Sequence, residues 1–329
     1  MRIAVVILNW NGRSLLEKYI PSVVAHSSDA NIYLADNASS DDSVSYIKKN
    51  FPDIKIIVNK ENGGYAKGYN DALNSLEEDI YCLLNSDVEV TPNWLDPIYE
   101  EFANQKDTAI IQPKILDQKN KQFFEYAGAA GGFIDKYAYP FCRGRIFNSV
   151  EKDEQQYSER YPIFWASGAC LFIRKEVFRA LNGFDESFFA HMEEIDLCWR
   201  AYNSNYNTIY LGQSTIYHQG GATLKNSSPK KTYLNFRNSL FTLTKNAPGN
   251  LLLLVLTRLI LDGIAALKFF FDFKWKHSLA ILNAHISYYQ HLNRLILKRK
   301  ALSKKPKYYR VKSIVWAYFL MKKKSFNSL

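Results

Sequence analysis

The N-terminal part of the chain alternates short apolar runs with amphipathic segments. The apolar runs predict strands at residues 2–8, 31–35, 54–58 and 80–84. The segments between them predict helices at residues 13–26, 41–50 and 65–77. This strand and helix rhythm is typical of a parallel sheet with helices on both faces. We therefore expect an α/β fold with a mixed, mostly parallel sheet flanked by helices.

Each predicted strand ends on a cluster of polar residues. The clusters begin at Asn9, Asp36, Asn59 and Asn85. The carboxyl ends of parallel strands share one edge of the sheet, where ligands of such folds bind. We therefore expect the four clusters to converge on one cleft.

The cluster at the end of the fourth strand contains Asn85, Ser86 and Asp87. A strand buried on both faces has no water to solvate an anion, so a carboxylate at its end is best placed in a cleft, facing a metal or a ligand. The alternative is that Asp87 only caps the turn before Thr91 and Pro92.

The pattern is less regular in the second half of the chain. Residues 117–160 are polar, aromatic and Gly-rich without a clear period, and we interpret them as a substrate-facing loop region. A strand is predicted at residues 164–174, and an acidic helix begins near Glu193. Two strand-like runs, 208–211 and 215–217, precede His218.

From residue 250 onward the pattern predicts long helices. Residues 251–271 are very apolar but contain Arg258, Asp262 and Lys268. A charge at a bilayer centre costs roughly 2.5 to 3.5 kcal/mol, and at about 100° per residue these three fall within one arc of roughly 120°. This favours a helix that lies on a membrane over one that spans it.

The charge is concentrated in the same region. Residues 273–329 carry 14 Lys or Arg and no Asp or Glu, which leaves 28 basic and 32 acidic residues before them. Basic clusters interleaved with aromatic residues suit anionic headgroups, at roughly 1 kcal/mol per charge. Because the positive charge is absent from the predicted cleft, nucleic acid is not an expected partner.

Two observations predict the compartment. The four cysteines form no C-x-x-C pair, and those in apolar runs are typical of buried, reduced thiols. The first apolar run is too short for a signal peptide. We expect a cytoplasmic protein that is peripherally attached to the inner face of the cell membrane. We also expect two parts: a catalytic domain at residues 1–245 and a helical, basic, amphipathic membrane-associating region at residues 246–329.

Seven short motifs follow one another along the chain. They are VVILNWNG (5–12), DNASSD (36–41), NGGYA (62–66), LLNSD (83–87), SGA (167–169), GFDE (183–186) and EEIDL (193–197). Together they resemble the family 2 glycosyltransferases, in particular the rhamnosyltransferase-like branch of bacterial surface-polysaccharide biosynthesis. The resemblance covers roughly residues 1–245. It implies a GT-A fold and an inverting transfer from a nucleotide-diphosphate sugar, dTDP-rhamnose being one candidate, to a lipid-linked or polysaccharide acceptor.

The resemblance also implies a metal ion, Mg²⁺ or Mn²⁺, because such an ion stabilises the charge of a leaving diphosphate. The Asp-x-Asp motif of the family appears here as Asn85-Ser86-Asp87, with an amide in place of the first acid. Asp87 is therefore the implied ligand, and Glu89 is a weaker candidate. His218 resembles the histidine that closes over the diphosphate or metal; a purely structural role is the alternative.

The resemblance assigns further positions to the two substrates. Asp36 would accept hydrogen bonds from the nucleoside, or else would only form a turn with Asn37 and Ser39. The other implied nucleotide-sugar residues are Asn9, Asn62, Gly63, Gly64, Asn85 and Ser86, and the implied acceptor residues are Trp165, Ser167 and Gly168. Arg237 and Asn238 match a family feature that either contacts an anion or lies on a helix surface.

An inverting transfer requires a base that takes the proton of the acceptor hydroxyl. The family carries a Glu-Asp pair at the start of a helix, whereas this chain carries Glu193-Glu194. Glu194 falls on the base position, and Glu193 substitutes for it if the helix is rotated. Acidic residues in a first helical turn are also favoured by the helix dipole alone.

Two other classes of function compete with this interpretation. A sugar-nucleotide pyrophosphorylase shares the α/β sheet and the metal carboxylates, but requires a Gly-rich, basic phosphate loop, which residues 9–14 do not supply. A non-enzymatic membrane-surface protein would account for the basic tail but not for the polar strand ends.

Overall fold

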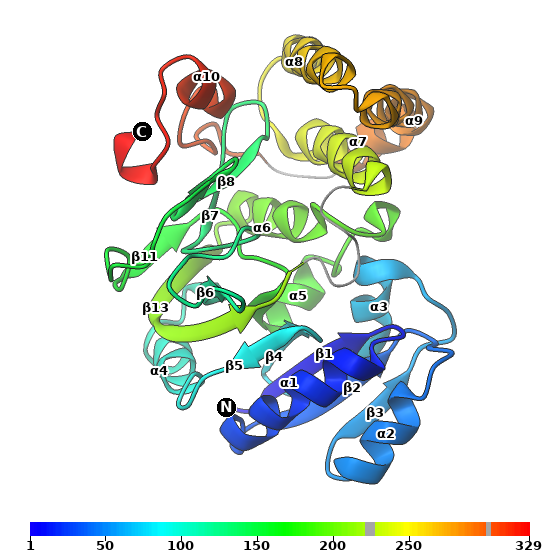
Figure 1. Cartoon of the computed structure of the whole chain (residues 1–329), viewed down its shortest axis with the longest axis vertical. Helices are drawn as coiled ribbons and strands as arrows, with labels where there is room; N and C mark the ends of the chain where they lie inside the picture. The colour runs from blue at the N-terminus through cyan, green and yellow to red at the C-terminus, as the bar shows by residue number, and fades with distance from the viewer. Residues whose placement is uncertain (221–227, 301–303) are drawn as a thin grey trace.

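The computed structural model describes residues 1–220, 228–300 and 304–329 and is built on a nine-stranded mixed sheet (Figure 1). Its strands are β1 (Ile3–Asn9), β2 (Asn31–Asp36), β3 (Lys55–Val58), β4 (Ile80–Asn85), β5 (Val88–Val90), β6 (Thr108–Asp117), β11 (Arg160–Ile163), β12 (Cys170–Arg174) and β13 (Asn207–His218). The order is β11-β13-β6-β12-β4-β1-β2-β3, and β5 pairs with β13. Strands β1 to β4 are parallel, and β12 enters antiparallel between β4 and β6. The predicted fold class is confirmed.

Helices cover both faces of this sheet. One face packs against α1 (Arg13–His26), α2 (Ser43–Asn50) and α4 (Asp96–Asn104), the other against α3 (Gly64–Leu73), α5 (Lys175–Ala180) and α6 (Glu193–Asn203). Successive side chains of a strand point to opposite faces. In β1, accordingly, Val5 packs in the apolar core on the side of α1, α2 and α4, and Val6 packs in the apolar core on the side of α3, α5 and α6.

The prediction that residues 117–160 form a loop region is wrong in part. They contain a four-stranded sheet of β7 (Gly132–Ile134), β8 (Pro140–Cys142), β9 (Arg145–Ile146) and β10 (Ser149–Val150). Strands of two or three residues are too short to show an alternating pattern. Tertiary packing stabilises them: the ring centroid of Phe133 lies 5.0 Å from that of Phe326, near the end of the chain.

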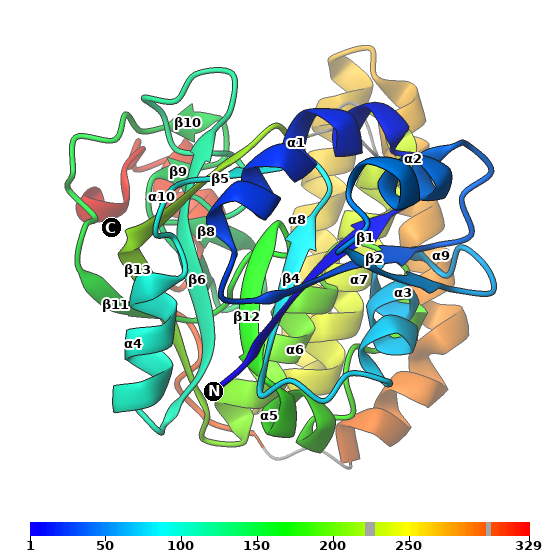
Figure 2. The ribbon, with the colours of Figure 1, turned by 90° about the horizontal axis from the view of Figure 1, so that it is seen from below.

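The C-terminal helices pack on this α/β core. They are α7 (Pro229–Asn246), α8 (Leu251–Phe271), α9 (Trp275–Lys300) and α10 (Ile314–Phe319), with short 3-10 helices η1 (Glu186–Phe188) and η2 (Phe326–Ser328). Helices α7, α8 and α9 lie side by side (Figures 1 and 2). Beyond α9, Tyr308 stacks on Trp199 at 4.6 Å, and the Ile314 amide donates to Asp135 Oδ2 at 3.0 Å. The expected boundary at residue 245 falls inside α7.

Helix α8 has the predicted bounds but turns two of its three charges inward. Arg258 and Asp262 are buried and form an ion pair at 2.7 Å, and the Tyr139 hydroxyl donates to Asp262. Lys268 is exposed and pairs with Asp272. The outward face of α8 is therefore mostly apolar. In the described ranges, no helix is both long enough and apolar enough to cross a bilayer.

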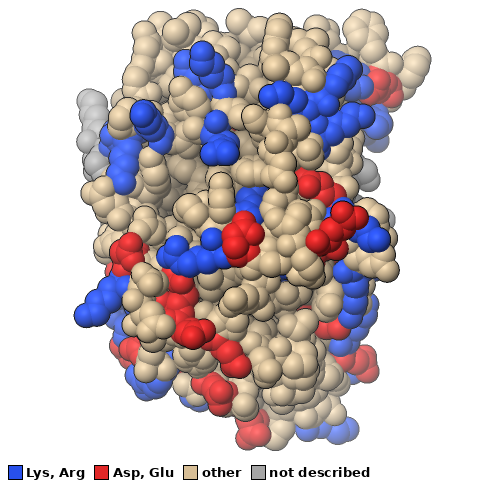
Figure 3. Space-filling model, turned by 90° about the vertical axis from the view of Figure 1, so that its left-hand side faces the viewer, with Lys and Arg blue, Asp and Glu red and all other residues tan. Residues whose placement is uncertain are grey.

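The prediction of buried, reduced cysteines is confirmed. All four cysteines are buried and free. Asp196 and Arg200 form an ion pair at 2.9 Å within α6. On the face drawn in Figure 3, the upper part of the molecule shows Lys and Arg with almost no Asp or Glu, whereas side chains of both signs are mixed lower down.

Candidate functional site

The polar strand ends meet at one edge of the sheet, as predicted. Asn9 at the end of β1 is in register with Asp36 at the end of β2, and Leu8 is in register with Asn85 at the end of β4. Asn59 follows β3, and its amide N–H donates to the Asp36 carbonyl at 2.8 Å. The chain therefore brings the four clusters to a single edge.

The Asp36 carboxylate is held by its protein neighbours. Its Oδ1 accepts from Asn9 Nδ2 at 2.8 Å and from the Ser39 hydroxyl at 2.6 Å, and its Oδ2 accepts from the Ser39 amide at 2.8 Å. The turn with Ser39, one of the two interpretations of Asp36, is thus present. Contact with a nucleoside stays a prediction.

Asp87 lies in a buried group with His218 and Glu125. The short strand β5 pairs with the end of β13 so that Val88 is in register with His218. This register places His218 Nε2 3.1 Å from Asp87 Oδ1, and His218 Nδ1 lies 3.4 Å from Glu125 Oε1. All three side chains are buried. An imidazole therefore lies between two carboxylates at the carboxyl edge of the sheet.

This arrangement shifts the pKa of both Asp87 and His218. Burial alone would lower the pKa of His218, but the charges of Asp87 and Glu125 outweigh burial and raise the pKa to about 10. Burial likewise acts to raise the pKa of Asp87, but His218 outweighs it and lowers that pKa. Asp87 and His218 consequently form an ion pair at neutral pH, and we call these two residues together with Glu125 the triad.

The side chains around Asp87 could provide some of the ligands of a divalent ion, with a substrate providing the others. Among the residues that the structure describes, no three His, Cys, Asp or Glu side chains are arranged to hold a metal by themselves. The His218 ring separates the two carboxylates, so the protein offers one carboxylate and one imidazole. Mg²⁺ is commonly bound by one or two carboxylates together with substrate phosphates. A ligating His usually has its second ring nitrogen beside a carboxylate, as His218 has beside Glu125.

Glu193 and Glu194 open helix α6, as predicted; Glu193 is buried and Glu194 is half-buried. The Oε2 atom of each is buried and has no hydrogen-bond partner within the described part of the chain. Burial, reinforced by the charge of Glu194, raises the pKa of Glu193 well above its usual range. Burial also raises the pKa of Glu194 to about 7. A carboxyl with such a pKa is suited to proton transfer near neutral pH.

The segment before these glutamates has an unusual backbone. Phe189, His191 and Met192 have φ values of 65°, 68° and 74°, a region that non-glycine residues seldom adopt. Asn238 in α7 stabilises it: its Nδ2 donates to the carbonyl oxygens of Phe188, Ala190 and His191 at 3.0, 2.9 and 2.7 Å. Strained backbone of this kind persists only where its surroundings hold it, and it is concentrated at functional sites.

Arg237 supports the same segment. Its Nη2 donates to the carbonyl oxygens of Ser187 at 3.2 Å and Phe188 at 3.0 Å. Arg237 and Asn238 thus contact the backbone before the glutamates, which neither of the two interpretations of their motif describes.

Gly64 and Tyr65 connect this segment to the strand ends. Gly64 has φ +77°, and a Cβ there would collide with the carbonyl oxygen of Phe189. That carbonyl accepts from the Tyr65 amide at 2.7 Å, and the Tyr65 hydroxyl donates to the Gly168 carbonyl at 2.8 Å. The absence of a side chain at Gly64 therefore lets the segment before the glutamates pack against this turn. From the sequence, we expect the nucleotide to be the group that approaches the turn.

The remaining residues predicted to bind a substrate or a metal make contacts with other protein groups. Trp165 is a core side chain whose Nε1 donates to the Phe133 carbonyl, so it does not form an open wall of an acceptor site. Ser167 is also buried, and its hydroxyl donates to the Ala127 carbonyl. Asn62 Oδ1 accepts from the Gly64 amide at 3.0 Å. Glu89 pairs with Lys121 at 2.6 Å and is not part of the triad.

Sequence reasoning missed Glu125, Tyr65 and His191 as members of this region. Glu125 lies in the aperiodic segment, where nothing distinguishes it from other acidic residues. His191 Nε2 is buried without a hydrogen-bond partner among the described residues, and burial with the nearby Lys231 charge lowers its pKa to about 4. Its proximity to the Glu-Glu motif was the one available signal.

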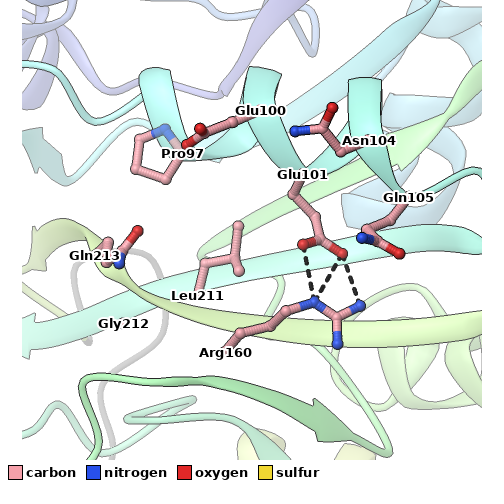
Figure 4. A pocket seen from close by; sticks show the side chains of 9 residues that line it. All are labelled: Pro97, Glu100, Glu101, Asn104, Gln105, Arg160, Leu211, Gly212 and Gln213. Atoms are coloured by element: carbon pink, nitrogen blue, oxygen red, sulfur yellow. Dashed lines mark hydrogen bonds and ion pairs between the residues drawn. The ribbon is translucent and has the colours of Figure 1, made fainter.

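A separate surface pocket of about 190 Å³ lies between α4 and β13 (Figure 4). Arg160 contacts Glu101 there at 2.8 Å, and Glu101 also accepts from Thr108. Thr108 begins β6, whereas His218 is in register with the opposite end of that strand. The pocket contains no residue of the triad or the glutamate pair.

Comparison with known proteins agrees with this geometry. The family model described as glycosyl transferase family 2 matches residues 4–181. The chain is 23% identical over 229 residues to N-acetylglucosaminyl-diphospho-decaprenol L-rhamnosyltransferase of Mycobacterium tuberculosis, covering 65% of this chain and 75% of that one. It is 25% identical over 247 residues to the low-salt glycan biosynthesis hexosyltransferase Agl10 of Haloferax volcanii, covering 72% and 73%.

A solved structure supports the fold. The mannosyltransferase PcManGT from Pyrobaculum calidifontis, in complex with GDP-Man and Mn²⁺, superposes with a TM-score of 0.54 at 11% identity, covering 88% of this chain and 87% of that chain.

Proposed function

Because this chain belongs to glycosyl transferase family 2 and is a glycosyltransferase, we propose that it transfers a sugar from a nucleotide-diphosphate donor to a lipid-linked acceptor, with inversion. The observation that carries this proposal is the pair of sites at one end of the sheet: the Asp87, His218 and Glu125 triad, and Glu193 and Glu194 with their buried Oε2 atoms. Family membership sets aside the pyrophosphorylase and the non-enzymatic alternatives.

The donor half of the site consists of the strand ends and the triad. Asp87 and His218 would hold a Mg²⁺ or Mn²⁺ ion beside the donor diphosphate, and His218 would release its proton when the metal binds. The ion would supply positive charge to the leaving group. Glu125 lies beside the second nitrogen of His218 and fixes the orientation of the ring. The solved relative with GDP-Man and Mn²⁺ supports this arrangement by its fold.

The acceptor half consists of the glutamate pair. The acceptor hydroxyl attacks the anomeric carbon, the bond from that carbon to the diphosphate oxygen breaks, and Glu194 takes the hydroxyl proton. The raised pKa of Glu194 suits this role, since a base whose pKa lies near the working pH transfers protons most effectively. Dependence on dTDP-rhamnose is a finer proposal, supported by the rhamnosyltransferase relative.

Nucleotide binding tests the donor half directly. In thermal unfolding scans with UDP, dTDP or GDP, at least one nucleotide should stabilise the protein when Mg²⁺ or Mn²⁺ is present. A ligand at about 100 times its Kd contributes about 2.7 kcal/mol to the free energy of unfolding. Asp87→Ala should lose the metal-dependent part of this stabilisation, because the carboxylate beside His218 is removed.

Glu89→Ala is the matched control for this experiment. It removes a carboxylate two residues away that pairs with Lys121 outside the triad, so stabilisation by nucleotide and metal should persist. If no nucleoside diphosphate stabilises the wild-type protein, the proposed function is wrong. If Glu89→Ala loses the effect and Asp87→Ala keeps it, the metal ligand is Glu89.

We further propose that an anionic membrane surface is a partner, contacted by the turn between α8 and α9. We call this turn the hairpin tip and define it by Phe270, Phe271, Phe273 and Trp275. All four side chains are exposed, Phe273 to 93 %. Lys274 and Lys276 interleave with them, and aromatic side chains with lysines suit the boundary between headgroups and acyl chains.

Vesicle flotation tests the hairpin tip. The double variant Phe273→Glu, Trp275→Glu should bind vesicles containing phosphatidylglycerol at least about tenfold more weakly, since it removes two apolar anchors and adds two repelled charges. Val24→Glu changes an exposed apolar side chain of α1 and should bind as the wild type does. Equal binding by all three proteins would refute the hairpin tip as the contact.

A further inference from the structure

A groove between α7 and the beginning of α9 extends the site toward the hairpin tip. It has a volume of about 370 Å³, and its lining residues are Pro229, Lys230, Tyr233, Lys276, Leu279, Ala280 and Asn283. The Thr232 hydroxyl and His277 Nδ1, 2.7 Å apart, fasten the two helices beside it. The groove thus lies between helices that are held at a fixed spacing.

One end of the groove adjoins the segment before the glutamates. Lys230 Nζ lies 5.5 Å from the centre of the Phe189 ring. Phe189 begins the strained backbone that leads into Glu193, and its carbonyl contacts Tyr65. Figure 2 shows α7 and α9 side by side in this part of the molecule. A ligand held at Lys230 would therefore lie next to the segment that leads into Glu193 and Glu194.

The other end of the groove adjoins the hairpin tip. Lys276 and Leu279 belong to the first turns of α9, directly after Trp275, and Leu279 is exposed. The groove presents apolar side chains together with two ammonium groups, Lys230 from α7 and Lys276 from α9, which flank the contact between Thr232 and His277. An amphiphile with an apolar chain and an anionic group complements this distribution of charge.

We propose that this groove binds the lipid part of the acceptor: a prenyl-type chain in the apolar wall and its phosphate or diphosphate between Lys230 and Lys276. The chain would enter from the bilayer at the hairpin tip, and the sugar that follows the diphosphate would extend past Phe189 toward Glu194. This inference rests on the proposed function and adds to it the place and the residues that recognise the acceptor.

Calorimetric titration with farnesyl diphosphate tests the groove. The probe is used below its micelle concentration and with EDTA, so that a metal-dependent diphosphate site does not contribute. Saturable binding is expected, at least about tenfold tighter than that of either pyrophosphate or farnesol, because each lacks half of the recognised chemistry. Lys230→Gln with Lys276→Gln should weaken binding at least about tenfold, at roughly 1 kcal/mol for each lost charge.

Two matched substitutions distinguish the groove from the rest of α9. Leu279→Glu places a carboxylate on the groove wall and should weaken farnesyl diphosphate binding at least about tenfold. Leu282→Glu changes a similarly exposed leucine outside the groove and should bind as the wild type does. Equal losses in the two variants, or equal affinity for pyrophosphate and farnesyl diphosphate, would overturn the proposal.

The remaining outcomes are also decisive. If Leu279→Glu changes the sedimentation of the protein and not its affinity for the probe, the groove is a contact with a second copy of the chain and the proposal is wrong. Metal-dependent stabilisation by nucleotide should persist in all groove variants. If it persists and the probe does not bind, only the groove proposal fails; if it is absent from the wild-type protein, the proposed function fails.

Discussion

Glu194→Gln should lower the turnover number by roughly 10² to 10⁴, the range that a general base contributes. Glutamine keeps the size of the side chain and removes the atom that accepts the proton. Turnover is measured as nucleoside diphosphate released from the donor that stabilises the protein most, with N-acetylglucosaminyl-diphospho-farnesol as the acceptor. Stabilisation by nucleotide and metal should remain, because Glu194 lies outside the triad.

The pH dependence of the rate makes this prediction more specific. The base must be deprotonated, and burial raises the pKa of Glu194 to about 7. The wild-type rate should therefore rise with pH through neutrality, and the residual rate of Glu194→Gln should lack this rise. Glu193→Gln is the matched comparison and should lose less. If Glu194→Gln retains turnover and Glu193→Gln does not, the base is Glu193.

His218→Ala should lower turnover by about 10² to 10³, the usual loss when one preorganised group facing developing charge is removed. His218 is buried between Asp87 and Glu125, so its removal also leaves two carboxylates without their shared partner. Stabilisation by nucleotide and metal should fall together with turnover.

Glu125→Gln tests the orienting role separately. It leaves the Asp87 contact of His218 in place, and loss of a group that orients a metal ligand costs about tenfold to a hundredfold in affinity or activity. The expected order is therefore wild type, then Glu125→Gln, then His218→Ala, in both turnover and metal-dependent stabilisation. A larger loss for Glu125→Gln than for His218→Ala would mean that Glu125 is itself the ligand.

The donor edge of the site was predictable because its residues follow directly after strands. Asn9, Asp36 and Asn85 each end a strand that the apolar pattern identifies, and parallel pairing brings such ends together. The glutamate pair was predictable for a similar reason, since it opens a helix with a clear acidic start.

The contacts between distant segments were not predictable from local pattern. His218 reaches Asp87 only because β5, a very short strand, pairs with β13 in one register. Glu125 comes from a segment whose strands are too short to show a period. Burial of Trp165, which the resemblance implies to be an acceptor residue, was not predictable because Gly132, the glycine that its ring packs against, lies in a distant part of the sequence.

The attachment of the C-terminal segment to the core has a practical consequence for anyone who wishes to produce this enzyme without lipid. Deleting the segment 305–329 would remove Tyr308 from Trp199 and the Ile314 amide from Asp135, which is fully buried. A shortened chain would therefore lose folding stability, and it would still carry the exposed aromatic side chains of the hairpin tip. Substitutions at Phe273 and Trp275 on the intact chain are the better route to a water-soluble, crystallisable enzyme.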